Sequence, residues 1–350
     1  MIATNLWFWV GFNAFVLGML ALDLGVFHRK AHVVSPKEAG AWTAVWVTLA
    51  LLFAAGLWAY AGSEAALTFL TGYVIEEALS VDNIFVIVLI FAYFGVPLKY
   101  QHRVLFWGIL GALVMRGAFI AVGTLLISRF EWVLYLFGAL LVITGARMAL
   151  KHEESFDAEE STVARLARRV LPLTKRIDGP HFLVRENGRT MATPLLLVLV
   201  LVEATDLMFA IDSIPAIFSI TRDPFLVYTS NIFAVLGLRS LYFLLAHVVQ
   251  KFYLLRFGLA AILVFIGLKM LGEHYVHIPI AVSLGVVAGV LALSVVASLL
   301  FPRPEKLDLH GPHANPRAGR EGDDDSSGPP ASGGALDPAA AVGGAPPGAG

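Results

Sequence analysis

Six carboxylates lie deep inside long apolar stretches of this 350-residue sequence. A charge at the centre of a membrane-spanning helix costs at least about 2.5–3.5 kcal/mol, so acids kept there usually serve an ion pathway or a binding site. Two arginines, Arg116 and Arg239, are the only positive charges at comparable depth. An excess of up to four negative charges therefore has to be balanced by protons, bound cations or both. The acids are Glu76, Glu77, Asp82, Glu203, Asp206 and Asp212.

These acids recur at one spacing in two stretches of the chain. Ser63 and Thr193 are the expected N-caps of two helices, and an acid follows each cap by thirteen and again by nineteen residues. A small polar residue comes directly after the second acid. The matched residues are Glu76, Asp82 and Asn83 in the first stretch and Asp206, Asp212 and Ser213 in the second. Glu77 has no such counterpart, because Leu207 stands at the matching position.

Helical periodicity sorts these residues onto faces. Residues seven apart share a face, so Glu76 with Asn83, and Asp206 with Ser213, each form a stripe of oxygen atoms. Glu203 joins the second stripe, three residues before Asp206. The second acid of each stretch lies about 100–120° around a regular helix from its stripe. It faces either a neighbouring helix or a distorted turn.

The donor atoms indicate which ion could bind. Oxygen ligands select hard cations such as Mg²⁺, Ca²⁺ and Mn²⁺. The chain has no cysteine, and its histidines lie away from the acids, which weighs against zinc or copper. Spare acids could carry protons in exchange for a metal ion. The alternative is that some acids, Asp82 and Asp212 above all, are structural partners of Arg116 and Arg239. Asp23 is an interfacial charge or a further supporting residue.

The elements that position these acids are membrane-spanning helices. Of all residues 58% are hydrophobic and 15% charged, against about 25% charged in soluble domains. A spanning helix needs about 20 mostly apolar residues, and nine stretches qualify: 4–27, 40–60, 64–95, 103–126, 131–150, 193–218, 225–248, 254–271 and 278–301. We therefore expect an all-α polytopic helix bundle over 1–302. The net charge of −1 argues against a nucleic-acid partner.

Basic residues predict the orientation. The connections that follow the odd-numbered spans hold most of them, including eight lysines and arginines in the long connection 151–192. The connections that follow the even-numbered spans hold only Arg129 and Arg222. By the positive-inside rule the N-terminus is outside and the C-terminus cytoplasmic. The connection 151–192 then lies in the cytoplasm, either partly as a surface helix or as a solvated linker. Residues 303–350, rich in Gly, Pro, Ala, Asp and Ser, are expected to be a disordered cytoplasmic tail.

Three spans match three others in the same order. Besides the two acidic spans, Leu110-Gly111 resembles Leu236-Gly237, and Gly145-Ala146-Arg147-Met148 resembles Gly267-Leu268-Lys269-Met270. Residues 64–150 and 193–271 then form two units of opposite orientation. Such an inverted repeat is the usual build of a secondary transporter with its site at the bilayer midplane. No catalytic motif is present, so we expect neither an enzyme nor a bound cofactor.

The strings that carry these residues resemble the TerC family of membrane proteins, first associated with tellurium resistance. They are 76–83, 203–215, 228–243 and 23–27, and the resemblance covers about 5–302. It implies a bacterial inner-membrane protein of the lysine-exporter superfamily that exports Mn²⁺, and it adds Asn231 to the site candidates. Some relatives are linked to membrane-protein assembly, so a scaffold without transport is the competing hypothesis. Protein partners stay open.

Overall fold

The computed structural model describes residues 6–22, 34–150, 165, 172, 174, 179–186, 189–246 and 254–301. Asp23, the tail 303–350 and most of the connection 151–192 lie outside these ranges, so the expectations placed on them stay predictions. The described residues form nine helices and one two-stranded sheet. The helices are α1 (Leu6–Leu22), α2 (Pro36–Ala61), α3 (Ser63–Tyr93), α4 (Leu98–Arg129), α5 (Trp132–Leu150), α7 (Pro194–Phe218), α8 (Pro224–Leu245), α9 (Leu255–Leu271) and α10 (Ile280–Leu300).

Each helix coincides with one of the nine apolar stretches expected from the sequence. Six of them, α2, α4, α5, α7, α8 and α10, are long and apolar enough to cross a membrane. α1 and α9 are shorter, with 17 residues each, and α3 has 31 residues and carries the first group of acids. The chain is thus a multi-pass helical membrane protein, as predicted. That all nine helices cross the membrane stays a prediction.

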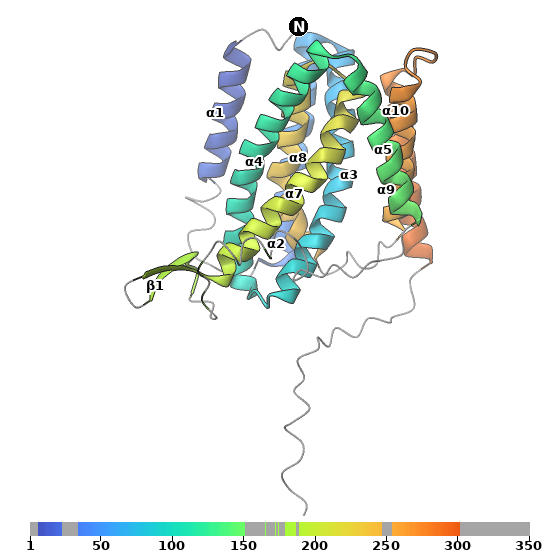
Figure 1. Cartoon of the computed structure of the whole chain (residues 1–350). Helices are drawn as coiled ribbons and strands as arrows, with labels where there is room; N and C mark the ends of the chain where they lie inside the picture. Colours follow the sequence, from blue (N-terminus) through green and yellow to red (C-terminus); the bar gives the residue numbers. More distant parts are fainter. Residues whose placement is uncertain are drawn as a thin grey trace, which may run out of the picture. The chain divides into compact units, whose positions relative to one another are not determined.

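The expectation of an all-helical fold, with the connection 151–192 either partly helical or a solvated linker, missed one element. β1 (Leu183–Glu186) and β2 (Arg189–Ala192) pair antiparallel, with Glu186 opposite Arg189. Asn187 and Gly188 are therefore the only residues between the strands, and Asn-Gly is the strongest short hairpin signal. The side chain of Thr193 donates hydrogen bonds to the carbonyls of His181 and Phe182. This hairpin leads directly into the start of α7 (Figure 1).

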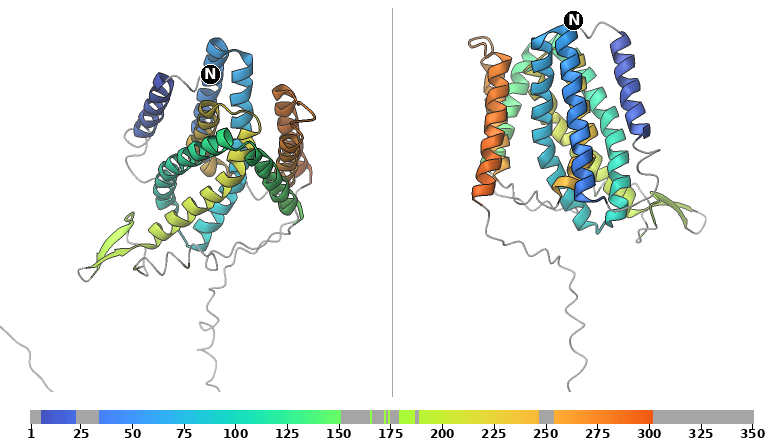
Figure 2. Two further views of the ribbon diagram at one scale, coloured as in Figure 1. Left: turned by 45° about the horizontal axis from the view of Figure 1, so that its top comes forward. Right: turned by 180° about the vertical axis from the view of Figure 1, so that it is seen from behind.

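The acidic helices α3 and α7 pack against each other and against several further helices. α3 packs against α2, α7 and α8, and α4 packs against α7 and α8. α8 is buried over most of its length. α1 stands at one edge of the helices and α10, beside α9, at the opposite edge (Figures 1 and 2). The two acidic helices are therefore shielded by neighbours on several sides.

Two close contacts join α5 to α9. A Cβ atom placed on Gly267 would lie 2.7 Å from the Gly138 carbonyl oxygen, and one on Gly145 would lie 2.7 Å from the Ala260 carbonyl oxygen. Only small residues allow backbones to approach so closely, as is common where membrane helices pack. These contacts make α5 and α9 one tightly packed pair beside the acidic helices.

Aromatic side chains fasten α1 to the bundle. Phe12 contacts Phe225, Tyr228 and Phe233 of α8 with ring centroids 5.7–6.0 Å apart. The Tyr228 hydroxyl also donates a hydrogen bond to Asn13 Oδ1 at 2.8 Å. The ring of Tyr228 in turn lies near Gly117 of α4. A single side chain of α8 thus bridges α1 and the helix that carries Arg116.

Candidate functional site

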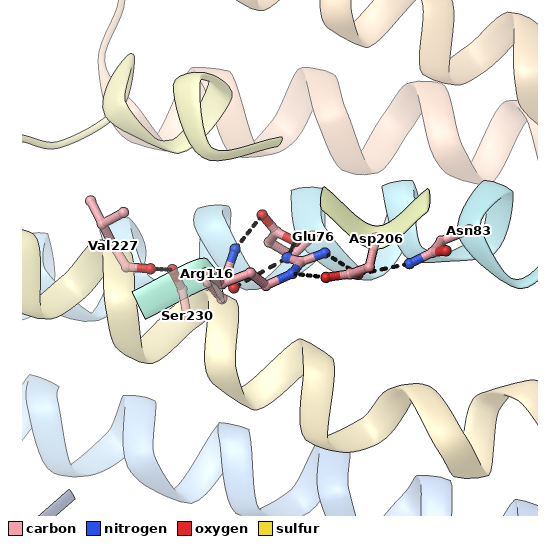
Figure 3. A network of polar contacts seen from close by, with 7 residues as sticks. Glu76, Asn83, Arg116, Asp206, Val227 and Ser230 are labelled. Carbon is pink, nitrogen blue, oxygen red and sulfur yellow. Dashed lines mark hydrogen bonds and ion pairs between the residues drawn. The ribbon is translucent and has the colours of Figure 1, made fainter. Parts of the chain in front are cut away.

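One buried arginine joins the two acidic helices. Nε and Nη2 of Arg116, on α4, donate to the two carboxylate oxygens of Asp206 on α7, at 3.0 and 2.9 Å. Nη1 donates to Glu76 Oε2 on α3 at 2.7 Å and to Asn231 Oδ1 on α8 at 3.1 Å. We call Glu76, Asn83, Arg116, Asp206 and Asn231 the polar cluster (Figure 3). It connects four helices through residues that are at most 4% exposed.

Two amides complete the polar cluster. The Asn231 amide donates to Glu76 Oε1 at 2.7 Å, and the Asn83 amide donates to Asp206 Oδ1 at 3.0 Å. All four carboxylate oxygens of the cluster therefore accept a hydrogen bond. Because Arg116 cannot lose its proton in a protein, the two carboxylates and one guanidinium leave a formal charge of −1.

Close helix packing places Asn231 beside Glu76. A Cβ atom on Gly72 of α3 would lie 2.7 Å from the Ser230 hydroxyl of α8, so only glycine lets the two helices approach this closely. Ser230 directs its own hydroxyl to the carbonyls of Leu226 and Val227, and it lies next to the cluster in Figure 3. The absence of a side chain at residue 72 thus brings the amide of α8 within reach of the carboxylate of α3.

Asp82 and Asp212, which the sequence placed among the metal ligands together with Glu76 and Asp206, lie outside the polar cluster. Asp212 accepts a hydrogen bond from Thr144 of α5 at 3.1 Å. Asp82 is half-buried, and the positive charge that acts on it belongs to Arg256 in the first turn of α9. Both acids are therefore associated with the α5–α9 pair. Thr144 was not predicted, since one threonine in an apolar helix carries no signal.

Two further glutamates rest against glycines of neighbouring helices. The Glu203 carboxylate occupies the position that a side chain on Gly111 of α4 would take, because a Cβ atom there would overlap its Oε1 and lie 2.6 Å from its Oε2. Glu77 Oε1 lies 3.4 Å from the corresponding position on Gly237 of α8. Glu203 Oε2 is buried and accepts no hydrogen bond from any residue that the structure describes. Among the described acids it alone has a buried carboxylate oxygen without a hydrogen-bond partner.

The other predicted site residues are spread along the same helices. Ser213 is 1% exposed, and within the described ranges its hydroxyl has no hydrogen-bond partner. Arg239 is buried on α8, eight residues beyond Asn231. Across the part of the chain that is described, no three acidic or histidine side chains lie close enough together to hold a metal ion. Glu76 and Asp206, two of the four acids expected to hold the metal with Asp82 and Asp212, hold the Arg116 guanidinium between them.

Comparison with known proteins places this arrangement in a family. A family model described as "Integral membrane protein TerC family" matches residues 61–306, which include every member of the polar cluster. The chain belongs to the TerC family. The resemblance inferred from the acidic strings is thereby confirmed, although the metal ligands predicted on those strings remain untested.

The similar TerC relatives are bacterial membrane proteins. The chain is 57% identical to an uncharacterised membrane protein of Myxococcus xanthus, over 84% of its own length and 92% of the relative's. It is 52% identical to an Escherichia coli protein named "Putative membrane-bound redox modulator Alx", over 82% and 92% of the two lengths. An uncharacterised membrane protein of Rickettsia felis is 44% identical over 83% and 97%. No solved structure matches the chain significantly.

Proposed function

We propose that this protein carries a divalent metal ion across the bacterial inner membrane, and that it exports Mn²⁺ from the cytoplasm. The observation that supports this most is that Glu76 and Asp206, from two different helices, both bind the buried guanidinium of Arg116. A site that holds two carboxylates and two amides, in residues that are 0–4% exposed, suits a cation stripped of most of its water. Arg116 fills that role in the present state.

The chemistry of the side chains favours a hard metal ion. The acids and amides of the polar cluster could bind a metal ion only through oxygen atoms, which are the ligands that Mn²⁺, Mg²⁺ and Ca²⁺ prefer. The chain contains no cysteine, so it has no thiol for redox chemistry of its own. If the protein shares the redox effect named for Alx, that effect has to pass through something it binds or moves, such as a metal ion.

The proposed inverted repeat gains support from the α5–α9 pair. Aligning Gly145 with Gly267 shifts the numbering by 122, so Gly138 then corresponds to Ala260. A two-fold axis between the repeats would exchange Gly138 with Ala260 and Gly267 with Gly145. The contact between Gly138 and Gly267 would then have a symmetric counterpart between Ala260 and Gly145, and both contacts occur. Such reciprocal contacts are expected of a self-complementary interface. Two units related in this way could rock about a central site to open it to either side.

Transport can be tested directly with the purified full-length protein in liposomes. Uptake or release of Mn²⁺, Ca²⁺, Mg²⁺ and Zn²⁺ is measured with and without a pH gradient, which also tests proton coupling. We expect flux of Mn²⁺, lost in Asp206→Asn and kept in Glu64→Gln, which removes an exposed acid at the start of α3. Liposomes that move none of the four ions would refute the proposal.

A scaffold without transport is the second candidate. The observation in its favour is that Arg116 and the two amides already satisfy all four carboxylate oxygens without a metal ion. Under this hypothesis the charge-balanced double variant Asp206→Asn, Arg116→Gln should keep full function in cells, because folding would be the only task of the pair. Under the transport hypothesis the same variant folds but no longer protects a deletion strain from Mn²⁺.

A further inference from the structure

The polar cluster leaves no room for a metal ion beside Arg116. Its guanidinium nitrogens lie 2.7–3.0 Å from oxygens of Glu76 and Asp206, and the amides cover the remaining positions. Divalent ions bind carboxylate oxygens directly, at about 2.0–2.6 Å, and would meet the guanidinium in the same place with like charge. Occupation of this carboxylate pair by Arg116 and by an ion is therefore mutually exclusive.

A guanidinium displaced from the pair has one evident destination. α4 and α7 run in the same direction, because Gly108 faces Val202 and Gly123 faces Phe218. Glu203 precedes Asp206 by three residues on α7, which is about 4.5 Å along the helix. Helical side chains lean toward the N-terminus of their helix, and on α4 that direction leads from Arg116 toward the level of Gly111. The Glu203 carboxylate lies against that glycine.

The charge and the hydrogen bonding of Glu203 also favour its binding the Arg116 guanidinium. Its Oε2 is buried and has no hydrogen-bond donor among the described residues. An unpartnered carboxylate oxygen in such a place is unfavourable, and a guanidinium would satisfy it. With the arginine on Glu203 and a divalent ion between Glu76 and Asp206, the formal charges of the whole group sum to zero.

We propose that Arg116 is a tethered cation that competes with the transported ion for the Glu76–Asp206 pair, and that Glu203 receives its guanidinium when the ion binds. This inference rests on the proposed transport function. An arginine suits the task because it stays charged at any physiological pH. It would neutralise half of the negative charge of the empty carboxylate pair, so that the carrier can change its orientation after releasing the ion.

The experiment is a double-mutant cycle on full-length purified protein, with Mn²⁺ binding measured by calorimetry and flux measured in liposomes. Arg116→Gln removes the competitor and should lower the Mn²⁺ Kd by about tenfold or more, while net flux falls because the empty site is left uncompensated. Glu203→Gln removes the destination and should raise the Kd at least about threefold, as for a weakened contact ion pair. Glu64→Gln is the matched control for loss of one carboxylate.

The decisive result is the coupling between the two positions. In the Arg116→Gln background, Glu203→Gln should have no further effect on Kd, because no guanidinium remains to be received. An equal effect of Glu203→Gln in both backgrounds overturns the inference. If Arg116→Gln does not fold, an unchanged Kd in Glu203→Gln alone overturns it as well. Wild-type protein that neither binds nor moves Mn²⁺ removes the proposed function too, whereas wild-type flux with an unaffected Glu203→Gln removes only the tethered cation.

Discussion

The fit between Gly111 and Glu203 gives a sharp test, because one added methyl group should move a carboxylate without weakening the helix. In Gly111→Ala the new Cβ atom would lie 2.6 Å from Glu203 Oε2, whereas ordinary contacts begin at 3.4 Å. Glu203 Oε1 would lie closer still, so the carboxylate has to move by more than 0.8 Å, the difference between the two distances given for Oε2. It is the end of a flexible side chain, so it can move at little steric cost.

The expected consequence can be estimated from Coulomb's law. At an effective dielectric constant of about 20, lengthening a contact ion pair from about 4 to 4.8 Å weakens it by about 0.7 kcal/mol, which corresponds to a factor of about three. If Glu203 receives the Arg116 guanidinium, Gly111→Ala should thus raise the Mn²⁺ Kd about threefold or more. Stability should be unchanged or higher, since alanine is favoured over glycine in a helix by up to about 1 kcal/mol.

The matched control is Gly108→Ala on the same helix. Gly108 also faces α7, but its added Cβ atom would lie 3.4 Å from a methyl carbon of Val202 and touch no carboxylate. The assays are Mn²⁺ calorimetry and thermal unfolding in detergent, performed on both variants and on the wild type. Equal Mn²⁺ affinity in the two variants, with Gly111→Ala well folded, would show that the position of the Glu203 carboxylate has no part in ion binding.

Three further changes test the packing around the site. Gly267→Ala should lower the thermal unfolding midpoint in detergent, because its Cβ atom would meet the backbone of α5 at 2.7–2.9 Å and overpacking costs about 1–3 kcal/mol; Gly289→Ala on α10, with nothing within 4 Å, should not. Tyr228→Phe removes the hydrogen bond to Asn13 and should speed proteolysis or hydrogen exchange of α1 while leaving the midpoint within a few degrees; unchanged exchange contradicts the bridging role. Asn231→Leu leaves a buried carboxylate oxygen and a guanidinium N–H without a partner, which costs about 1–3 kcal/mol each, so a midpoint equal to wild type would contradict the network.

The sequence predicted the helices and the meeting of two acids for the same reason. Long apolar stretches can satisfy their backbone in lipid only as helices, and repeated spacing placed Glu76 and Asp206 at matching depths. Their common partner could not be predicted in this way. Arg116 was one of two deep arginines, and which acids it contacts depends on how α4 is rotated and on the side-chain reach, neither of which a hydropathy pattern specifies.

The features that we did not predict from the sequence depend either on contacts between residues far apart in the chain or on a short local signal. Gly111 and Gly237 look like ordinary glycines of membrane helices until a carboxylate from another helix is found against each of them. Asp212 has its partner 68 residues earlier, at Thr144. The hairpin is different, because Asn187-Gly188 is a local sequence signal for it. The high charge of the connection favoured a helix or a linker in our interpretation, so this signal was missed.

The net negative charge of the polar cluster favours the transporter over the scaffold. Replacing a buried ionic network by apolar residues of similar size is often neutral or stabilising in proteins, so a network kept only for folding has little reason to exceed electrical balance. Here one guanidinium faces two carboxylates, and a third acid, Glu203, lies one helical turn away with an oxygen that no described residue satisfies. A scaffold gains nothing from this surplus of negative charge. A carrier needs this surplus, because a buried site can hold a divalent cation only where its acidic side chains carry more negative charge than the arginine neutralises.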